Sequence, residues 1–310
     1  MSEIDALIKM LAENPLPADD LEAAAKQFDE SAPRTADDID TEDLNIDGVP
    51  CQRHTPPGAD TARVIMFLHG GGYVFGSLRS HEGLASELAR ASNCQSVVVD
   101  YRLAPAHAFP AAVEDSTKVY RWLLDNGYSS ANIVIAGDSA GGGLTVATMV
   151  ALREQNLALP AAGVCLSPWV DLECKGDSHT SRAEIDPLLT GDLLRGIGMA
   201  YAGGNLTAAT ASPIHADLTG LPPLLIHVGE REVLFSDAEN LHKKALAAGV
   251  DSSFEEWKDM IHVWQGFYPM LSEGRQAIAK IGEFVQAKLG YPPHKSSDYR
   301  KVDHSGSDPG

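Results

Sequence analysis

The sequence predicts an α/β protein with a mainly parallel central sheet and helices on both of its faces. Apolar, β-branched runs at 63–68, 96–99 and 132–136 have the length of strands buried on both sides. Each run is followed by a stretch with helical spacing of its apolar residues, and this alternation is typical of a parallel sheet. Because ligands and reacting groups collect at the carboxyl ends of such strands, we expect a functional site there.

The remaining elements follow from local patterns. Residues 1–45 predict two short amphipathic helices, interrupted by Pro15 and Pro17. They are too short to form a core, so we expect them to cover the main domain as part of a cap, with a dimer contact as the alternative. The other expected strands lie at 47–52 (a weak one), 163–167, 224–229 and 254–257, and the other expected helices at 80–91, 109–124, 142–153, 192–201, 236–248 and 272–289.

Residues from about 172 to 220 interrupt the alternation of strands and helices. We expect this insertion to form the second part of the cap over a catalytic domain that spans 46–290. The segment 291–310 is polar and rich in Gly, Pro and Ser, which predicts a flexible tail without a catalytic role.

Composition limits the partners. The 310 residues include 43 acidic and 24 basic side chains, a net charge of −19, which disfavours nucleic acid and anionic membranes. The chain lacks a signal-peptide pattern and a run of about 18 apolar residues, so we expect a soluble, cytoplasmic protein. The cysteines are far apart and lack metal-ligand spacing, which predicts free thiols and no metal: Cys51, Cys94, Cys165 and Cys174.

The strongest motif is Gly137-Asp138-Ser139-Ala140-Gly141, which joins an apolar strand to a run of small helix-forming residues. Gly-x-Ser-x-Gly in this setting is typical of a nucleophile elbow, where a serine hydroxyl is exposed on a sharp turn above a sheet. The glycines are required because side chains there would collide with the packed strand and helix. The pattern predicts Ser139 as a nucleophile.

A serine nucleophile needs a base, and the base needs an orienting acid. In proteins with such an elbow the chain order is serine, acid, histidine. Glu232 follows a late strand and is the expected acid, with Glu230 and Asp237 as contenders. Among eleven histidines, His262 has the position expected of the base, after the last strand.

Acyl transfer also needs donors for the negative charge that develops on the carbonyl oxygen. The loop His69-Gly70-Gly71-Gly72-Tyr73 follows the 63–68 strand. We expect the backbone N–H groups of Gly71, Gly72 and Ala140 to form an oxyanion hole. A phosphate-binding loop is disfavoured because no Gly-Lys-Ser/Thr follows. Tyr73 lies beside the glycine loop, and Trp264 lies two residues after His262. Each could equally line the substrate pocket or be a packing residue.

These motifs resemble the hormone-sensitive-lipase-like family of α/β-hydrolases, the bacterial family IV esterases. The resemblance covers about residues 60–290, and it also rests on Asp100–Pro105, Ser167–Leu172 and the Gly229–Leu234 loop. It implies the α/β-hydrolase fold, hydrolysis of short-chain carboxylic esters without a cofactor, a helical cap, and homodimers along the last strand. Two departures are Glu232, where many members have Asp, and Ala106, where Glu is frequent.

The sequence therefore predicts an esterase in which Ser139 attacks a small-molecule ester, His262 moves the proton and Glu232 orients His262. A lactonase, for example of monoterpene lactones, or an amidase could use the same residues. A ligand-binding protein without catalysis, as in the plant hormone receptors of this fold, is disfavoured because those receptors lose the histidine that is present here as His262.

Overall fold

The computed structural model describes residues 1–17 and 20–291, so the tail predicted for 291–310 lies outside the described residues except for Tyr291. The fold is built on an eight-stranded sheet with the order β1-β2-β4-β3-β5-β6-β7-β8. Strands β3 to β8 pair in parallel, whereas β1 with β2 and β2 with β4 pair antiparallel. The predicted α/β architecture, that of an α/β-hydrolase, is confirmed.

The expected strands and helices are present, most of them with ends shifted by one to three residues. The strands are β1 (Asp40–Ile46), β2 (Val49–Thr55), β3 (Asp60–Leu68), β4 (Cys94–Val99), β5 (Ile133–Asp138), β6 (Ala162–Leu166), β7 (Leu224–Gly229) and β8 (Ser252–Trp257). The helices are α1 (Glu3–Glu13), α2 (Leu21–Ser31), α3 (Leu78–Ser92), α4 (Ala111–Asp125), α5 (Ala140–Glu154), α6 (Ser178–Ser181), α7 (Gly191–Ala202), α8 (Phe235–Ala247) and α9 (Ser272–Lys288).

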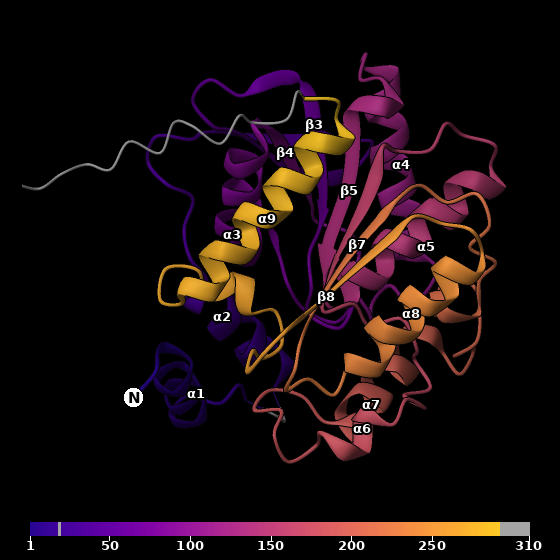
Figure 1. Ribbon diagram of the computed structural model, residues 1–310. Helices are drawn as coiled ribbons and strands as arrows, with labels where there is room; N and C mark the ends of the chain where they lie inside the picture. Colours follow the sequence, from indigo (N-terminus) through magenta and orange to yellow (C-terminus); the bar gives the residue numbers. More distant parts are fainter. Residues whose placement is uncertain (18–19, 292–310) are drawn as a thin grey trace, which may run out of the picture.

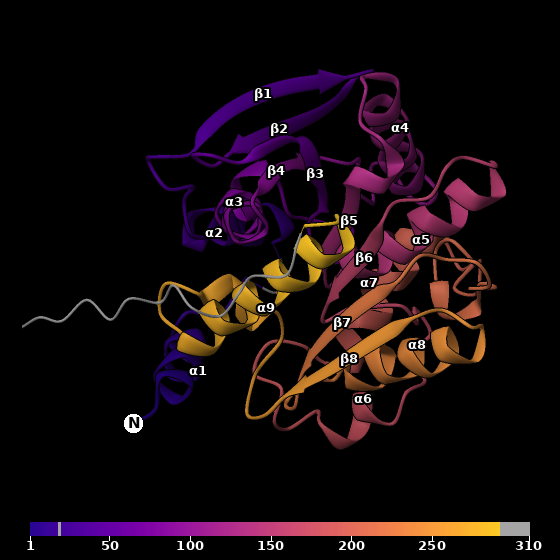
Figure 2. The same ribbon diagram turned by 45° about the horizontal axis from the view of Figure 1, so that its top comes forward.

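Helices cover both faces of the sheet, as Figures 1 and 2 show. Leu84 of α3 and Ile281 of α9 pack with sheet residues such as Phe67 in one core cluster. Leu144 of α5 and Leu241 of α8 belong to a second, larger cluster on the other face. The central strands are buried on both sides, which explains their continuous apolar sequences.

The hairpin of β1 and β2 is the main difference from the sequence-based expectation, which had only one weak strand near residues 47–52. Its two-residue turn is Asp47-Gly48, and both residues have positive φ angles of 50° and 87°. Asp-Gly is a strong signal for such a turn. β1 itself is acidic and mostly exposed, so its sequence lacks the alternation that marks a half-buried strand.

Helix α1 is anchored to the segment that follows β8. Ile4 and Leu7 form a small apolar cluster with Met260, Ile261 and Trp264. In addition, the carboxylate of Glu3 accepts a hydrogen bond of 2.7 Å from Ser272 N at the start of α9. The N-terminal helix therefore buries its apolar stripe against the catalytic part of the chain, next to the predicted base. β8 is an edge strand of the sheet, along which the expected homodimer would form.

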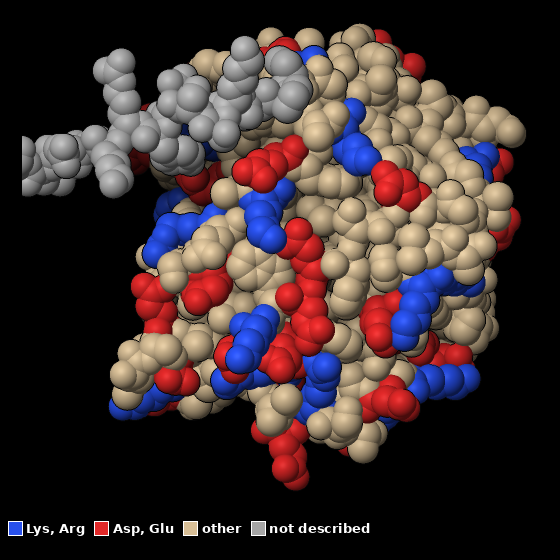
Figure 3. All heavy atoms as spheres, viewed as in Figure 1, with Lys and Arg blue, Asp and Glu red and all other residues tan. Residues whose placement is uncertain are grey.

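The surface carries both signs of charge despite the acidic composition. In the orientation of Figure 1, acidic and basic side chains are interspersed over the visible face (Figure 3). Among the described residues, no helix combines the length and the apolar character needed to cross a membrane.

The turn between β5 and α5 depends on close contact between backbones. A Cβ atom added to Gly141 would lie 1.9 Å from the carbonyl oxygen of Leu68, and one added to Gly137 would lie 2.3 Å from that of Gly141. Backbone atoms cannot yield as a flexible side chain can. Both glycines of the motif are therefore required by packing.

We predict that Gly141→Ala lowers the free energy of unfolding by about 3 kcal/mol or more, because the methyl group overlaps the β3 backbone. The matched control is Gly196→Ala in α7, where nothing lies within 4 Å of the added Cβ. That substitution should leave stability unchanged or raise it by up to about 1 kcal/mol, since alanine favours a helix interior. Urea denaturation measures both, and equal effects would contradict the packing argument.

Candidate active site

Ser139 lies at the sharp turn predicted for it, between the end of β5 and the first residue of α5. Its backbone angles, φ 53° and ψ −121°, are outside the regions that a non-glycine residue normally adopts. Its N–H donates to the carbonyl of Leu166 and its own carbonyl accepts from Trp169 N, so the strained turn is held by the end of β6 and the residues that follow it. The residue keeps a slight exposure of 8%.

The glycine loop follows β3 and is fixed beside this turn. Gly71 and Gly72 have φ angles of 107° and 65°, which favour glycine. Within the described chain, the N–H groups of Gly71, Gly72 and Ala140 donate to no protein acceptor. In contrast, Gly70 N donates to the carboxylate of Asp138 over 3.0 Å. The residue before the serine thus ties the glycine loop to the elbow.

His69 anchors the glycine loop. Its Nδ1 lies 2.8 Å from the carbonyl oxygen of Gly70, and its ring stacks on Tyr101 with centroids 4.2 Å apart. The hydroxyl of Tyr101 donates to the carbonyl of His69 over 2.6 Å. Burial, with the neighbouring His81, lowers the pKa of His69 to about 3. His69 is therefore neutral and holds the loop.

His262 and Glu232 form a buried hydrogen-bonded pair. Nδ1 of His262 lies 2.8 Å from Oε2 of Glu232, and Glu232 is fully buried. Burial alone would lower the pKa of His262, but the hydrogen bond and charge of Glu232, helped by Asp186 and Asp138, outweigh it and raise that pKa. An Nδ1–H that donates to the carboxylate leaves Nε2 as the acceptor.

Ser139 follows β5, Glu232 follows β7 and His262 follows β8, so all three lie beyond the carboxyl ends of strands of the parallel set. No hydrogen bond joins Ser139 Oγ to His262 among the described residues. Such bonds are often long in free enzymes and shorten when substrate binds. The two are linked through the end of β6, because the carbonyl of its last residue, Leu166, accepts from Ser139 N and the hydroxyl of the next residue, Ser167, accepts from Val263 N over 3.1 Å.

The other acidic contenders have different partners. Glu230 accepts a hydrogen bond from Asp259 N over 2.9 Å and is only half-buried. Asp237 is buried in α8, where its carboxylate lies 2.9 Å from Nε2 of His179 and accepts N–H groups of Val170 and Asp171. Only Glu232 of the three carboxylates contacts His262.

Tyr73 and Trp264 are both almost fully buried, at 1% and 0% exposure. Tyr73 stacks on Tyr201 of α7, with ring centroids 3.8 Å apart. Trp264 packs with the apolar residues of α1 and stacks on His227. Of the two roles considered for each residue, these contacts match packing.

The insertion reaches the segment that carries Glu232. Asp186 accepts a hydrogen bond of 2.8 Å from Val233 N, the residue directly after Glu232. Ser178 and Ser236 exchange hydrogen bonds of 3.0 and 2.9 Å between α6 and the start of α8. Sequence analysis missed Asp186, although its position before Pro187 is a frequent turn signal.

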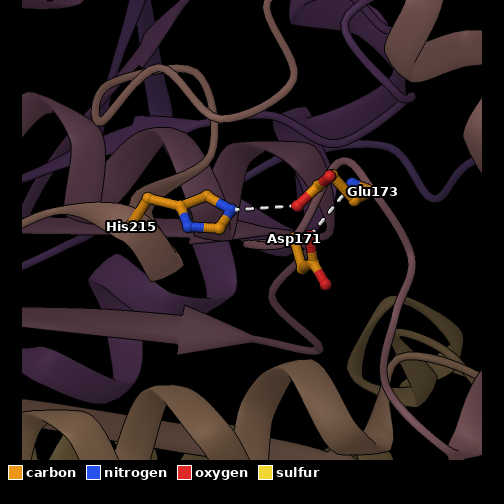
Figure 4. A group of neighbouring side chains, drawn as sticks. All are labelled: Asp171, Glu173 and His215. Carbon is orange, nitrogen blue, oxygen red and sulfur yellow. Dashed lines mark hydrogen bonds and ion pairs between the residues drawn. The ribbon is translucent and has the colours of Figure 1, made fainter.

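One further cluster has metal-ligand chemistry. Asp171, Glu173 and His215 bring side-chain ligand atoms within 4.8 Å of one another (Figure 4). Yet Lys175 Nζ already lies 2.7 Å from Glu173, and both oxygens of Asp171 accept backbone N–H groups. The cluster is consistent with a local charge network.

The sheet order, the serine at the β5–α5 turn and the hydrogen-bonded Glu232–His262 pair after β7 and β8 are those of an α/β-hydrolase. Residues 65–266 match the family Abhydrolase_3, described as alpha/beta hydrolase fold. The chain belongs to the hormone-sensitive-lipase (family IV) esterases of this fold and is a carboxylic ester hydrolase.

Three relatives illustrate this membership. The acetyl-hydrolase of Streptomyces hygroscopicus is 48% identical over 235 residues, which are 76% of this chain and 79% of that protein. The crystal structure of an esterase from the bacterial hormone-sensitive lipase family has a TM-score of 0.91 at 48% identity, covering 94% of this chain and 100% of that one. EstE5 soaked with p-nitrophenyl butyrate has a TM-score of 0.90 at 45% identity, covering 93% and 99%.

The His262–Glu232 pair generates a prediction. In Glu232→Gln the imidazolium loses its anionic partner while its burial stays, so we expect the pKa of His262 to fall below the ordinary value of about 6.5. Imidazole NMR titration measures this, with the His262 signal assigned from His262→Gln. Glu230→Gln is the matched control and should leave the pKa of His262 in place. An unchanged pKa in Glu232→Gln would disprove the coupling.

Proposed function

We propose that the protein hydrolyses short-chain carboxylic esters with Ser139 as nucleophile, His262 as general base and Glu232 as the acid that orients His262. The observation that carries this proposal is the buried 2.8 Å contact between His262 Nδ1 and Glu232, which leaves Nε2 free to accept a proton. His262 takes the proton of Ser139, and Ser139 attacks the ester carbonyl to form an acyl-enzyme. Water activated by His262 then releases the acid.

We also propose that the N–H groups of Gly71, Gly72 and Ala140 bind the oxyanion. Three features support this assignment: these donors have no protein acceptor in the described chain, the glycines expose their backbone, and Ala140 N lies at the start of α5. The first N–H groups of a helix lack partners within it and carry partial positive charge. Oxyanion donors of this kind act where the transition state gains charge.

The preference for short acyl chains draws on two observations. The insertion lies close above the glycine loop, because a Cβ atom on Gly72 would be 3.1 Å from Ile197 of α7 and Tyr201 of α7 stacks on Tyr73. In addition, one relative is an acetyl-hydrolase and another was soaked with p-nitrophenyl butyrate. The short distance between α7 and the glycine loop, together with these relatives, favours small acyl groups.

Ser139→Ala is expected to reduce the kcat for p-nitrophenyl butyrate by at least about 10³-fold, because no other group can form the acyl-enzyme. The measurement is release of p-nitrophenolate, together with urea denaturation to show that the variant is folded. Ser116→Ala, a buried serine of α4, is the matched control and should keep normal activity. Substantial turnover by folded Ser139→Ala would refute the nucleophile.

The substrate class is tested by an acyl series of p-nitrophenyl esters from acetate to laurate, with a monoterpene lactone and a p-nitroanilide in parallel. We expect kcat/KM to be highest for acetate or butyrate and to fall at least about tenfold by laurate, a loss of about 1.4 kcal/mol in transition-state binding. A maximum at laurate would contradict the short-chain proposal. If the lactone or the anilide is turned over faster than the esters, that compound's class replaces esters as the proposed substrate class.

A further inference from the structure

Ser167 is a fully buried serine directly after β6 that contacts both sides of the proposed acid–base pair. Its hydroxyl donates to Oε1 of Glu232 over 2.7 Å and accepts from the N–H of Val263 over 3.1 Å. Val263 is the residue directly after His262. One hydroxyl group thus connects the acid, from the segment after β7, to the backbone beside the base, from the segment after β8.

The contact to Glu232 determines which oxygen faces the histidine. Oε1 accepts hydrogen bonds from Ser167 and, over 2.5 Å, from Gly229 N. Oε2 remains for His262. A glutamate has one more rotatable bond than an aspartate, so a carboxylate in this position needs additional fixed donors to hold one orientation.

The contact to Val263 supports an unusual backbone. Val263 has a φ of 49°, which is strongly disfavoured for a β-branched residue. Such a conformation persists only where the surroundings determine it. Ser167 binds the N–H group of this residue, and the peptide unit that carries this N–H begins at His262. The orientation of the imidazole therefore depends on the same hydroxyl that orients Glu232.

We propose that Ser167 is a positioning residue for catalysis, which sets the geometry of the Glu232–His262 pair without touching the substrate. This inference rests on the proposed function of Glu232 and His262. The role differs from that of Ser139, because Ser167 contacts Glu232 and the backbone beside His262.

The electrostatic consequence has a definite sign. The carboxylates that face His262 are Glu232 after β7, Asp186 of the insertion and Asp138 of β5, and all three raise its pKa. The Ser167 hydroxyl disperses part of the negative charge of Glu232. Without that donor the carboxylate attracts the imidazolium more strongly, so the pKa of His262 rises further. Loss of overall packing alone would not produce this shift.

The test compares Ser167→Ala with the wild type on p-nitrophenyl butyrate. We expect kcat to fall about 10- to 100-fold, the loss typical of removing a charge-assisted hydrogen bond, with KM changed less than about twofold. The acid limb of the pH profile of kcat/KM should move to higher pH in the variant. Ser116→Ala is the matched control, because Ser116 is also buried and makes two hydrogen bonds, to Val113 and Thr148. It should match the wild type in kcat and in the pH profile.

The variant Ser167→Gly removes the hydroxyl without adding backbone strain, so it separates the effect of the lost hydrogen bonds from an effect on folding. Ser167 has a φ of 47°, which glycine adopts without strain, so this variant is expected to fold even if Ser167→Ala does not. The proposal requires that Ser167→Gly loses kcat and shifts the pH profile as Ser167→Ala does. Wild-type kcat and pH profile in a folded Ser167→Gly would overturn it. If the wild type does not hydrolyse the ester, or Ser139→Ala does, the proposed function fails instead.

Discussion

The close approach of α5 to β3 is the constraint on which the site depends. Because the backbone at Gly141 lies against the carbonyl of Leu68, the chain must turn sharply between β5 and α5, and Ser139 takes up the strained conformation of that turn. The same approach places the start of α5 beside the glycine loop, which follows β3. One packing contact thus sets the relative position of Ser139, the proposed nucleophile, and the proposed oxyanion donors, and Asp138 joins the two by its bond to Gly70 N.

A buried carboxylate must be compensated by hydrogen bonds, since an unpaired one would be costly. Glu232 meets this requirement with three donors, from Gly229, Ser167 and His262. These donors come from three different segments, so the compensation of one charge also fixes the geometry of the loops. The buried carboxylate of Asp237 in α8 is compensated in the same way, by the N–H groups of Val170 and Asp171 and by His179 of the insertion.

The sequence predicted the fold, and it provided candidate site residues where the signal is local or follows chain order. Ser139 is marked by its own neighbours, and Glu232 and His262 follow late strands in the expected order. Ser167 could not be assigned from the sequence, because its partners are 65 and 96 residues away and depend on strand order. β1 was missed for a different reason: an edge strand with acidic, exposed side chains lacks a buried face to produce a pattern, although Asp47-Gly48 marks its turn.

The insertion is bonded to the groups beneath it, and this affects how the enzyme meets its substrate. Asp186 holds the backbone after Glu232, and Tyr201 stacks on the residue that ends the glycine loop. A lid that swings aside at an oil–water interface would break these contacts and disturb Glu232 and the glycine loop together. The proposed site therefore favours esters dissolved as single molecules, and the rate is expected to follow the concentration of dissolved monomer instead of the area of a lipid droplet.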